Sequence, residues 1–400
     1  MPHVVDTGAL LDEGLISPSL AEEIARRSRE TMVALAVNSV LCVGIIAATF
    51  GLIFWLADAM AVAVAGGIFL AIGLWVLLAG GTLYRMLGNA AALVGAGMLI
   101  GGAGIELVDK YEEIAEPIMI IGGGAIVLGA LWAFLKGRAK IAFVSGAILL
   151  MGLALHIAGL GLAMEDVSGW LTVAFYGYVA LAIAAAGWLI DVRLVTALAI
   201  APFAQMLDTG TAYFHAAYVF YSPEPTLTIL QMAALIGVCL WVTNKVSART
   251  GRHLGILAIL AAVVGNLAFL VGSLWGDHVA ISYFDGPVFD YSTQWTEERQ
   301  TLFEAEREAF EARFITISEH VFTAVWAVLL GLGAFWAAHA NRRGLFNAAM
   351  TFGGIHAYTQ MFESYGDEPL AWALGGLAAI PLAWGLWQLN QRWIAGQAEA

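Results

Sequence analysis

Residues 59–80 read AMAVAVAGGIFLAIGLWVLLAG and contain no charged side chain. An apolar run of about 20 residues is long enough for a helix to cross the hydrocarbon core of a membrane. Lipid offers no hydrogen-bond partners to backbone amides, so such a run is expected to be helical. This stretch therefore predicts a transmembrane helix, and similar runs recur along most of the chain.

The composition of the whole chain leads to the same prediction. Sixty per cent of the 400 residues are hydrophobic and 12% are charged, whereas soluble domains are typically about a quarter charged. The alternating segments of about ten residues that mark a membrane β-barrel are missing from the sequence. We predict an all-α integral membrane protein with about 12 transmembrane helices. The expected spans are 32–54, 59–80, 87–107, 117–135, 141–162, 169–190, 194–215, 226–244, 254–275, 319–340, 345–363 and 370–389.

The basic residues predict how these spans are oriented. Cytosolic loops of membrane proteins carry an excess of lysine and arginine. With a cytosolic N-terminus, 14 of the 18 basic residues fall in cytosolic segments. We therefore expect a multi-pass protein of the bacterial inner membrane with both termini in the cytosol. The 14 residues are Arg26, Arg27, Arg29, Arg85, Lys136, Arg138, Lys140, Arg193, Lys245, Arg249, Arg252, Arg342, Arg343 and Arg392.

Two similar segments indicate an internal repeat. RMLGNAA at 85–91 and RGLFNAA at 343–349 are identical at five of seven positions, and RLVTALA at 193–199 is a weaker copy. Each begins a predicted span that ends in an acidic, tyrosine-containing turn closed by Glu-Pro: YEEIAEP at 111–117, YSPEP at 221–225 and YGDEP at 365–369. Proline suits the first turn of the next helix, which explains each turn alone. Their recurrence predicts three copies of a four-helix unit.

The predicted copies are residues 31–140, 141–252 and 253–400. Each has an even number of spans, so all three share one orientation and are related by an axis along the membrane normal. Residues 1–30 precede them, and Ser17-Pro18 predicts the start of a short amphipathic helix on the cytosolic membrane surface.

An insert at 276–318 lengthens the third copy. Within 296–316, Phe303, Phe310 and Phe314 recur at helical spacing opposite an acidic face, which predicts an amphipathic helix on the outer side. This helix can cover an outer cavity, lie on the outer leaflet, bind a protein partner, continue into the next span or pack on the protein's own rim. The sequence leaves these alternatives open.

Ionisable residues at membrane depth are the candidates for ligand binding. They gather in the outer halves of the third, seventh and eleventh predicted spans, and the members of each set share one helix face. If the copies pack around a common axis, the three stripes converge on one outer-facing polar site. Alternatively, each stripe marks the place where its helix leaves the bilayer. The candidates are Glu106, Asp109, Gln205, Asp208, His215, His356, Gln360 and Glu363.

Other polar residues are isolated on apolar spans, and these more often hydrogen-bond between helices than bind a ligand. They are Asn38, His156, Gln231 and Asn266. Metalloprotease, nucleophile-elbow, phosphate-loop and dinucleotide motifs are missing from the sequence. Only two cysteines are present, so a cysteine-based metal site is excluded. We expect no catalytic residues, no metal, no cofactor and no nucleic-acid partner.

LLDEGLISPSLAEEIARR at 10–27 and NAAMTFGGIHAYTQMFESYGDEP at 347–369 resemble bacterial families of polytopic membrane proteins of unknown function. In these families an amphipathic N-terminal segment precedes many spans, and the resemblance carries no catalytic residue. Two functions are favoured over a membrane-embedded enzyme, which is the least favoured of three. One is a solute transporter or exporter, favoured by the parallel repeats and the polar stripes. The other is a non-transporting scaffold or lipid-handling subunit, favoured by the insert helix. Membrane lipids are expected partners of either.

Overall fold

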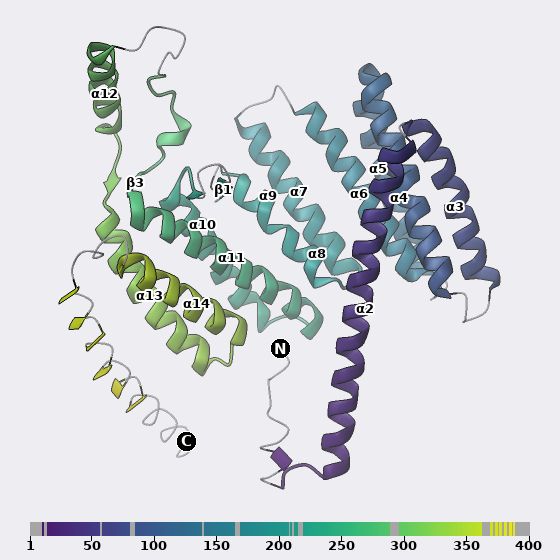
Figure 1. Cartoon of the computed structure of the whole chain (residues 1–400), viewed down its shortest axis with the longest axis horizontal. Coiled ribbons are helices and arrows are strands. Elements are labelled where there is room, and N and C mark those ends of the chain that lie inside the picture. The colour runs from purple at the N-terminus through teal and green to yellow at the C-terminus, as the bar shows by residue number, and fades with distance from the viewer. Residues whose placement is uncertain are drawn as a thin grey trace. The chain divides into compact units, whose positions relative to one another are not determined.

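The chain divides into two compact units. Unit 1 comprises Met1–Met206 and Val246–Ile256, and unit 2 comprises Leu207–Lys245 and Leu257–Ala400. Figure 1 labels the helices and strands of both units. The computed structural model describes residues 10–11, 14–56, 58–80, 85–137, 140–164, 169–207, 209, 212–214, 219–288, 296–361, 369–370, 373–374, 376–377, 380–381, 384–385 and 387–388.

Unit 1 consists of helices paired along the chain. α3 packs against α4 and α5 against α6 (Figure 1). Glycines allow the closest approach: a Cβ on Gly73 would lie 2.3 Å from the backbone nitrogen of Ala92. Small residues at such contacts are typical of helices that pack in lipid. The helices are α2 (Pro18–Leu56), α3 (Ala59–Ala79), α4 (Arg85–Lys110), α5 (Glu112–Lys136), α6 (Ala142–Ala163), α7 (Trp170–Leu189), α8 (Arg193–Leu198), α9 (Ile200–Gln205) and the start of α11 (Ala248–Trp275).

Unit 2 has an aromatic core between α11, α13 and α14. Phe269 stacks on Trp326 with ring centroids 6.2 Å apart, and Phe322, Leu330 and Phe352 complete the buried cluster. The elements are β1 (Ala212–Phe214), β2 (Val219–Tyr221), α10 (Pro225–Thr243), the rest of α11, β3 (Asp277–His278), a 3₁₀ turn (Ile281–Tyr283), α12 (Glu297–Glu311), β4 (Thr316–Ile317), α13 (Glu319–His339) and α14 (Arg343–Thr359).

The two small sheets are both antiparallel and two-stranded. Tyr213 pairs with Phe220 in the β1–β2 ladder. His278 pairs with Thr316 in the β3–β4 ladder. The second ladder joins the two ends of the insert.

The fold is that of an all-α multi-pass membrane protein, as predicted. Eight helices of the described residues are long and apolar enough to cross a membrane: α3, α4, α5, α6, α7, α10, α11 and α13. Large apolar side chains lie on the exposed faces of these helices. Trp75 on α3 is 69% exposed and Ile121 on α5 is 72% exposed. Such side chains are expected to contact lipid, because a water-soluble surface rarely exposes wide apolar patches.

The first helix is longer than predicted. α2 runs without interruption from Pro18 to Leu56, so the expected surface helix and the first expected span form one helix. Its charged residues end at Glu30. The remaining 26 residues extend about 39 Å, which is enough to cross the hydrocarbon core. Arg26 bridges Glu23 and Glu30, at 2.7 and 2.5 Å, on the polar part.

The prediction of one continuous helix at 194–215 is wrong. The structure has two short helices, α8 and α9, followed by the β1–β2 hairpin. Proline lacks the amide that would bond four residues back along a helix. Pro202 therefore leaves the carbonyl of Leu198 without its helical donor, and α8 ends at Leu198.

The Glu-Pro turns differ from one another. Pro225 is the first residue of α10, as predicted. Pro117 lies inside α5, which begins five residues earlier with Glu112 and Glu113 in its first turn. Acidic residues there are favourable beside the positive end of the helix dipole, and they start the helix before the proline. Residues 365–368 of the third turn lie outside the described residues, and in the predicted span 370–389 the 11 residues that are described are all helical.

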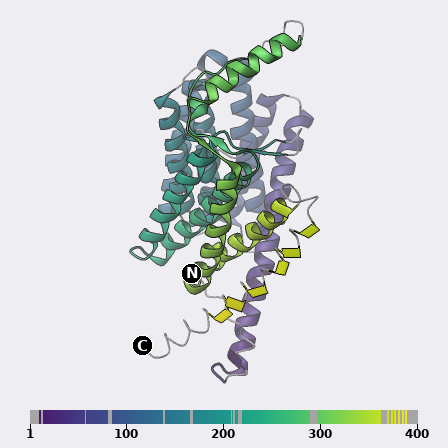
Figure 2. The same cartoon turned by 90° about the vertical axis from the view of Figure 1, so that its left-hand side faces the viewer.

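The insert helix is confirmed over 297–311 as α12. It does not continue directly into α13, because β4 separates the two. In both views α12 lies beyond the N-terminal end of α13 (Figure 1 and Figure 2). Phe310 and Phe314 contact each other, and Phe284 of the insert's own loop contacts Phe314 at a centroid distance of 5.4 Å. The aromatic face of this helix thus packs within the insert.

Candidate functional site

Three of the predicted site residues lie in unit 1. Glu106 on α4 is buried, and its Oε1 lies 2.9 Å from Nζ of Lys110. Its Oε2 has no hydrogen-bond partner within the described part of the chain. Asp109 is exposed at the same end of α4, and Gln205 is exposed at the end of α9.

Two others lie at the end of α14 in unit 2. The imidazole of His356 meets the indole of Trp326 edge to face, with centroids 4.7 Å apart. Gln360 follows one turn later, where α14 ends. Asp208, His215 and Glu363 lie outside the described residues. Convergence of the three stripes on one polar site therefore stays a prediction.

Two of the isolated polar residues bond between helices, as expected. Nδ1 of His156 on α6 donates to the carbonyl of Ile120 on α5 at 2.8 Å. His156 Nε2 lies 2.8 Å from the hydroxyl of Tyr178 on α7. In unit 2, Asn266 of α11 accepts a hydrogen bond at 2.7 Å from the indole nitrogen of Trp326 on α13.

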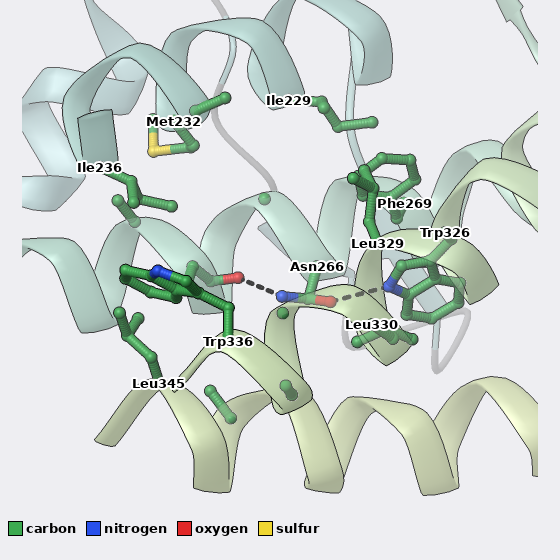
Figure 3. Close-up of a pocket in the computed structure, with 17 residues that line it drawn as sticks. Ile229, Met232, Ile236, Asn266, Phe269, Trp326, Leu329, Leu330, Trp336 and Leu345 are labelled. Carbon is green, nitrogen blue, oxygen red and sulfur yellow. Dashed lines mark hydrogen bonds between the residues drawn. The ribbon is translucent and has the colours of Figure 1, made fainter. Parts of the chain in front are cut away.

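An apolar cavity surrounds this asparagine. It has a volume of about 330 Å³ and lies between α10, α11, α13 and α14. Met232 lies on one side, Phe269 and Trp326 lie at one end, and Trp336 lies near the other (Figure 3). This volume falls at the lower end of the range of small-molecule sites. We call it the Asn266 cavity.

The position of the cavity follows from its helices. Asn266 is nine residues before the end of α11, and Trp326 is seven residues after the start of α13. At about 1.5 Å per residue, both lie about 10–14 Å from those helix ends. Three of the wall helices, α10, α11 and α13, are long and apolar enough to cross a membrane, and the fourth, α14, packs against α13. The cavity is therefore at membrane depth.

Asn266 gives this cavity its polar character. Its Nδ2 donates to the carbonyl of Ala262 at 2.6 Å, and its Oδ1 accepts from Trp326. A primary amide has two N–H donors and two oxygen lone pairs. The described contacts use one of each, so one donor and one lone pair are free for a ligand. Every other lining residue is apolar or aromatic, and a charged ligand would be bound without a counter-ion.

Unit 2 also contains a buried carboxylate that holds the insert. Glu224, fully buried at the start of α10, accepts hydrogen bonds from the backbone amides of Ala280 and Ser282 at 2.7 and 2.8 Å. In return, Asp277 of β3 accepts from the amide of Thr226 at 2.9 Å. Glu224 thus binds the loop of the insert, and Asp277 at the base of that loop caps α10.

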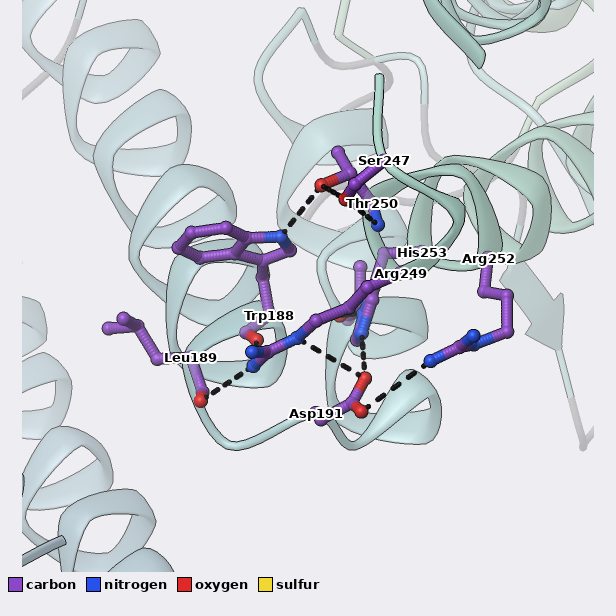
Figure 4. A network of polar contacts seen from close by, with 9 residues as sticks. Trp188, Leu189, Asp191, Ser247, Arg249, Thr250, Arg252 and His253 are labelled. Atoms are coloured by element: carbon purple, nitrogen blue, oxygen red, sulfur yellow. Dashed lines mark hydrogen bonds and ion pairs between the residues drawn. The ribbon is translucent and has the colours of Figure 1, made fainter. Parts of the chain in front are cut away.

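Unit 1 has a charged cluster at the turn between α7 and α8. Asp191 adopts a left-handed conformation with φ of 56°, which aspartate and asparagine tolerate better than most residues. Its carboxylate accepts from Nε2 of His253 at 3.0 Å and lies 3.5 and 3.6 Å from Arg249 and Arg252 (Figure 4). A carboxylate only accepts, so Nε2 of His253 carries the proton. We call these four residues the Asp191 cluster.

Further hydrogen bonds tie this cluster to the ends of the helices around it. Arg249 donates to the carbonyls of Trp188 and Leu189, where α7 ends. Nδ1 of the buried His253 lies 2.6 Å from the hydroxyl of Thr196 on α8. The threonine, histidine and aspartate thus line up like a hydrolase triad. Thr196 is 2% exposed, so no substrate can reach its hydroxyl and the arrangement joins helices.

Family models, curated proteins and solved structures were compared with the chain, and none matches. Within the described residues, no group of three or more histidine, cysteine, aspartate or glutamate side chains is placed to hold a metal ion. The Asn266 cavity was missed by the sequence interpretation because its walls come from four helices spread over more than 100 residues. Asn266 itself was the signal, and it was interpreted as a helix-packing residue.

Proposed function

We propose that this multi-pass membrane protein is a carrier for a small, uncharged and mostly apolar solute that binds in the Asn266 cavity. The observation that carries the proposal is the cavity itself: space at membrane depth, aromatic walls and one amide with unused hydrogen-bonding groups. Sites of this composition bind apolar molecules and orient them through a few polar contacts.

The lining residues favour a neutral solute over an ion. Transfer of an isolated charge from water into an apolar site is costly unless a counter-charge is present. The lining supplies none. Aromatic rings at both ends suit a flat or ring-containing molecule, since stacked and edge-to-face contacts add to area burial. The free amide groups suit one carbonyl, hydroxyl or amine.

Two glycines of α13 allow a matched test. Gly333 lines the cavity, whereas Gly331 does not, and a Cβ at either position meets nothing within 4 Å. Gly333→Leu should fill the cavity and Gly331→Leu should not, while both gain the same helix propensity. The probe is N-phenyl-1-naphthylamine, a neutral aromatic amine that fluoresces in apolar surroundings. Energy transfer from tryptophan to the probe in nanodiscs measures its binding.

We expect Gly331→Leu to bind the probe like the wild type and Gly333→Leu to bind at least about tenfold more weakly, a change of roughly 1.4 kcal/mol. Equal binding by both variants would contradict the cavity as the site.

Carriage is tested separately by steady-state accumulation of the probe in energised cells. Expression of the wild type and Gly331→Leu should change accumulation, and Gly333→Leu should not. Binding without any effect on accumulation would favour a scaffold or lipid-handling subunit.

We also propose the bacterial inner membrane as the location, with both termini cytosolic. The distribution of basic residues supports this orientation. The acidic insert then lies on the outer side.

A further inference from the structure

A groove on unit 1 is separate from the Asn266 cavity. It has a volume of about 770 Å³ and lies between α4, α5 and α6. Gly97, Gly101 and Gly104 form its α4 wall, and Ala154 and Ala158 form its α6 wall. The small side chains on both walls leave room for a hydrocarbon chain. From Gly97 to Val108 it follows α4 for about 16 Å.

Hydrocarbon is the expected content of this groove. α4, α5 and α6 are all apolar enough to cross a membrane, and the edge of the groove carries Ile105 and Val108, which are 48% and 43% exposed. An open apolar groove at that depth faces lipid chains instead of water. The remaining question is which lipid head group lies at its end.

The end of the groove is acidic. Asp109 and Glu112 line it and are both exposed, and no basic side chain lines it. Lys110, the neighbouring cation, bonds to Glu106 at 2.9 Å and lies outside the lining. By the predicted topology this is the outer end of α4. The ammonium of a zwitterionic head group is attracted here, and a head group with a net negative charge is repelled.

We infer that this groove binds a membrane phospholipid whose head group ends in an ammonium, with one acyl chain along the glycine and alanine walls and the ammonium beside Asp109 and Glu112. The charge of the two carboxylates complements an ammonium, and the apolar length beneath them matches a chain. The proposal does not depend on the proposed carrier function, because it concerns another unit and another ligand.

The experiment uses the full chain in nanodiscs made of equal parts of phosphatidylethanolamine and phosphatidylglycerol. The protein is released in a mass spectrometer under native conditions, and the retained lipids are counted by mass. The test variant is Asp109→Asn with Glu112→Gln. The matched control is Glu113→Gln with Glu116→Gln, two exposed glutamates of α5 that do not line the groove. Both variants lose two negative charges near the same membrane surface.

We expect the wild type and the control to retain phosphatidylethanolamine at least about threefold over phosphatidylglycerol, and the test variant to retain both equally. Gly101→Leu, which fills the groove, should lose the retained lipid of both kinds. The proposal is overturned if the wild type shows no preference, or if the control loses the preference as fully as the test variant. Melting temperatures of all variants show whether each is folded. The four substituted carboxylates are exposed, so folding should be kept.

Discussion

At the scale of single residues, the Asp191 cluster shows how one carboxylate organises a turn. The hydrogen bond from His253 is the largest of the effects that lower the pKa of Asp191 below its ordinary value. The positive charges of Arg249 and Arg252 lower this pKa further. Partial desolvation opposes them. A carboxyl whose pKa is lower in the folded state stabilises that state above its ordinary pKa. This contribution disappears as the pH falls through the lowered, folded-state pKa.

Asp191→Asn should therefore lower the melting temperature at neutral pH. Asparagine keeps the preference for the left-handed conformation, so the change reports on charge. The difference from the wild type should shrink as the pH falls from the ordinary pKa of the carboxyl, 3.8, through the lowered value. Melting curves across this range measure it, with the exposed Asp285→Asn as control. A difference that stays constant with pH would refute the role assigned to the carboxylate charge.

Asn266 is the second residue with a specific prediction. Asn266→Leu removes the acceptor of the Trp326 indole N–H, which is buried with its side chain. We expect the unfolding free energy to fall by about 1 kcal/mol, the usual size of an interhelical hydrogen bond in a membrane. Titration with a denaturing detergent measures it. The exposed Asn347→Leu is the control, and an equal loss there would indicate a general effect of the substitution.

At the scale of elements, two kinds of hydrogen bond hold the base of the insert: a backbone ladder between its two ends, and bonds between carboxylate side chains and backbone amides. The β3–β4 ladder joins its two ends. Glu224 accepts from its loop, and Asp277 caps α10. α12 is thus carried on a loop with a fixed base, although helix α12 itself is mostly exposed.

Glu224→Gln tests this anchoring. A glutamine has one acceptor oxygen where the carboxylate has two, so one of the amides of Ala280 and Ser282 loses its partner. An unsatisfied buried group costs about 1–3 kcal/mol. Hydrogen exchange of residues 280–282 should accelerate roughly tenfold or more, while exchange in α13 stays unchanged. The exposed Glu306→Gln on α12 should alter neither. Unchanged exchange in Glu224→Gln would contradict the anchoring.

At the scale of the whole molecule, the predicted topology rests on the 14 basic residues that fall in the expected cytosolic segments. Tags placed after Ala400 and beside Val288, which is 88% exposed in the insert, test it together. We expect the tag at the C-terminus to be labelled only after the membrane is permeabilised and the insert tag to be labelled in intact cells. Labelling of both tags from the same side would mean that one predicted span does not cross.

Features that depend on interactions between residues close in the sequence could be predicted, and features that depend on contacts between distant helices could not. Membrane helices form from local properties, apolar length and internal backbone bonding, so α3, α5, α6, α7, α10 and α13 appear close to their predicted places. The amphipathic pattern at 296–316 likewise predicted α12. The expectations at Pro202 and Pro117 were wrong, because the missing amide of Pro202 ends α8, whereas Glu112 and Glu113 start α5 before Pro117.

The amino-acid pattern alone was enough to predict an all-α multi-pass membrane protein, because most of its long apolar runs form helices that satisfy their own backbone without help from distant parts of the chain. The places of the cavity and the groove follow from contacts between helices that are far apart in the sequence. The Asn266 cavity needs four helices in contact, and the groove needs the small residues of α4 to face those of α6. Periodicity along one helix shows which residues share a face. It does not show which other helix that face meets, since packing of side chains across the gap decides that.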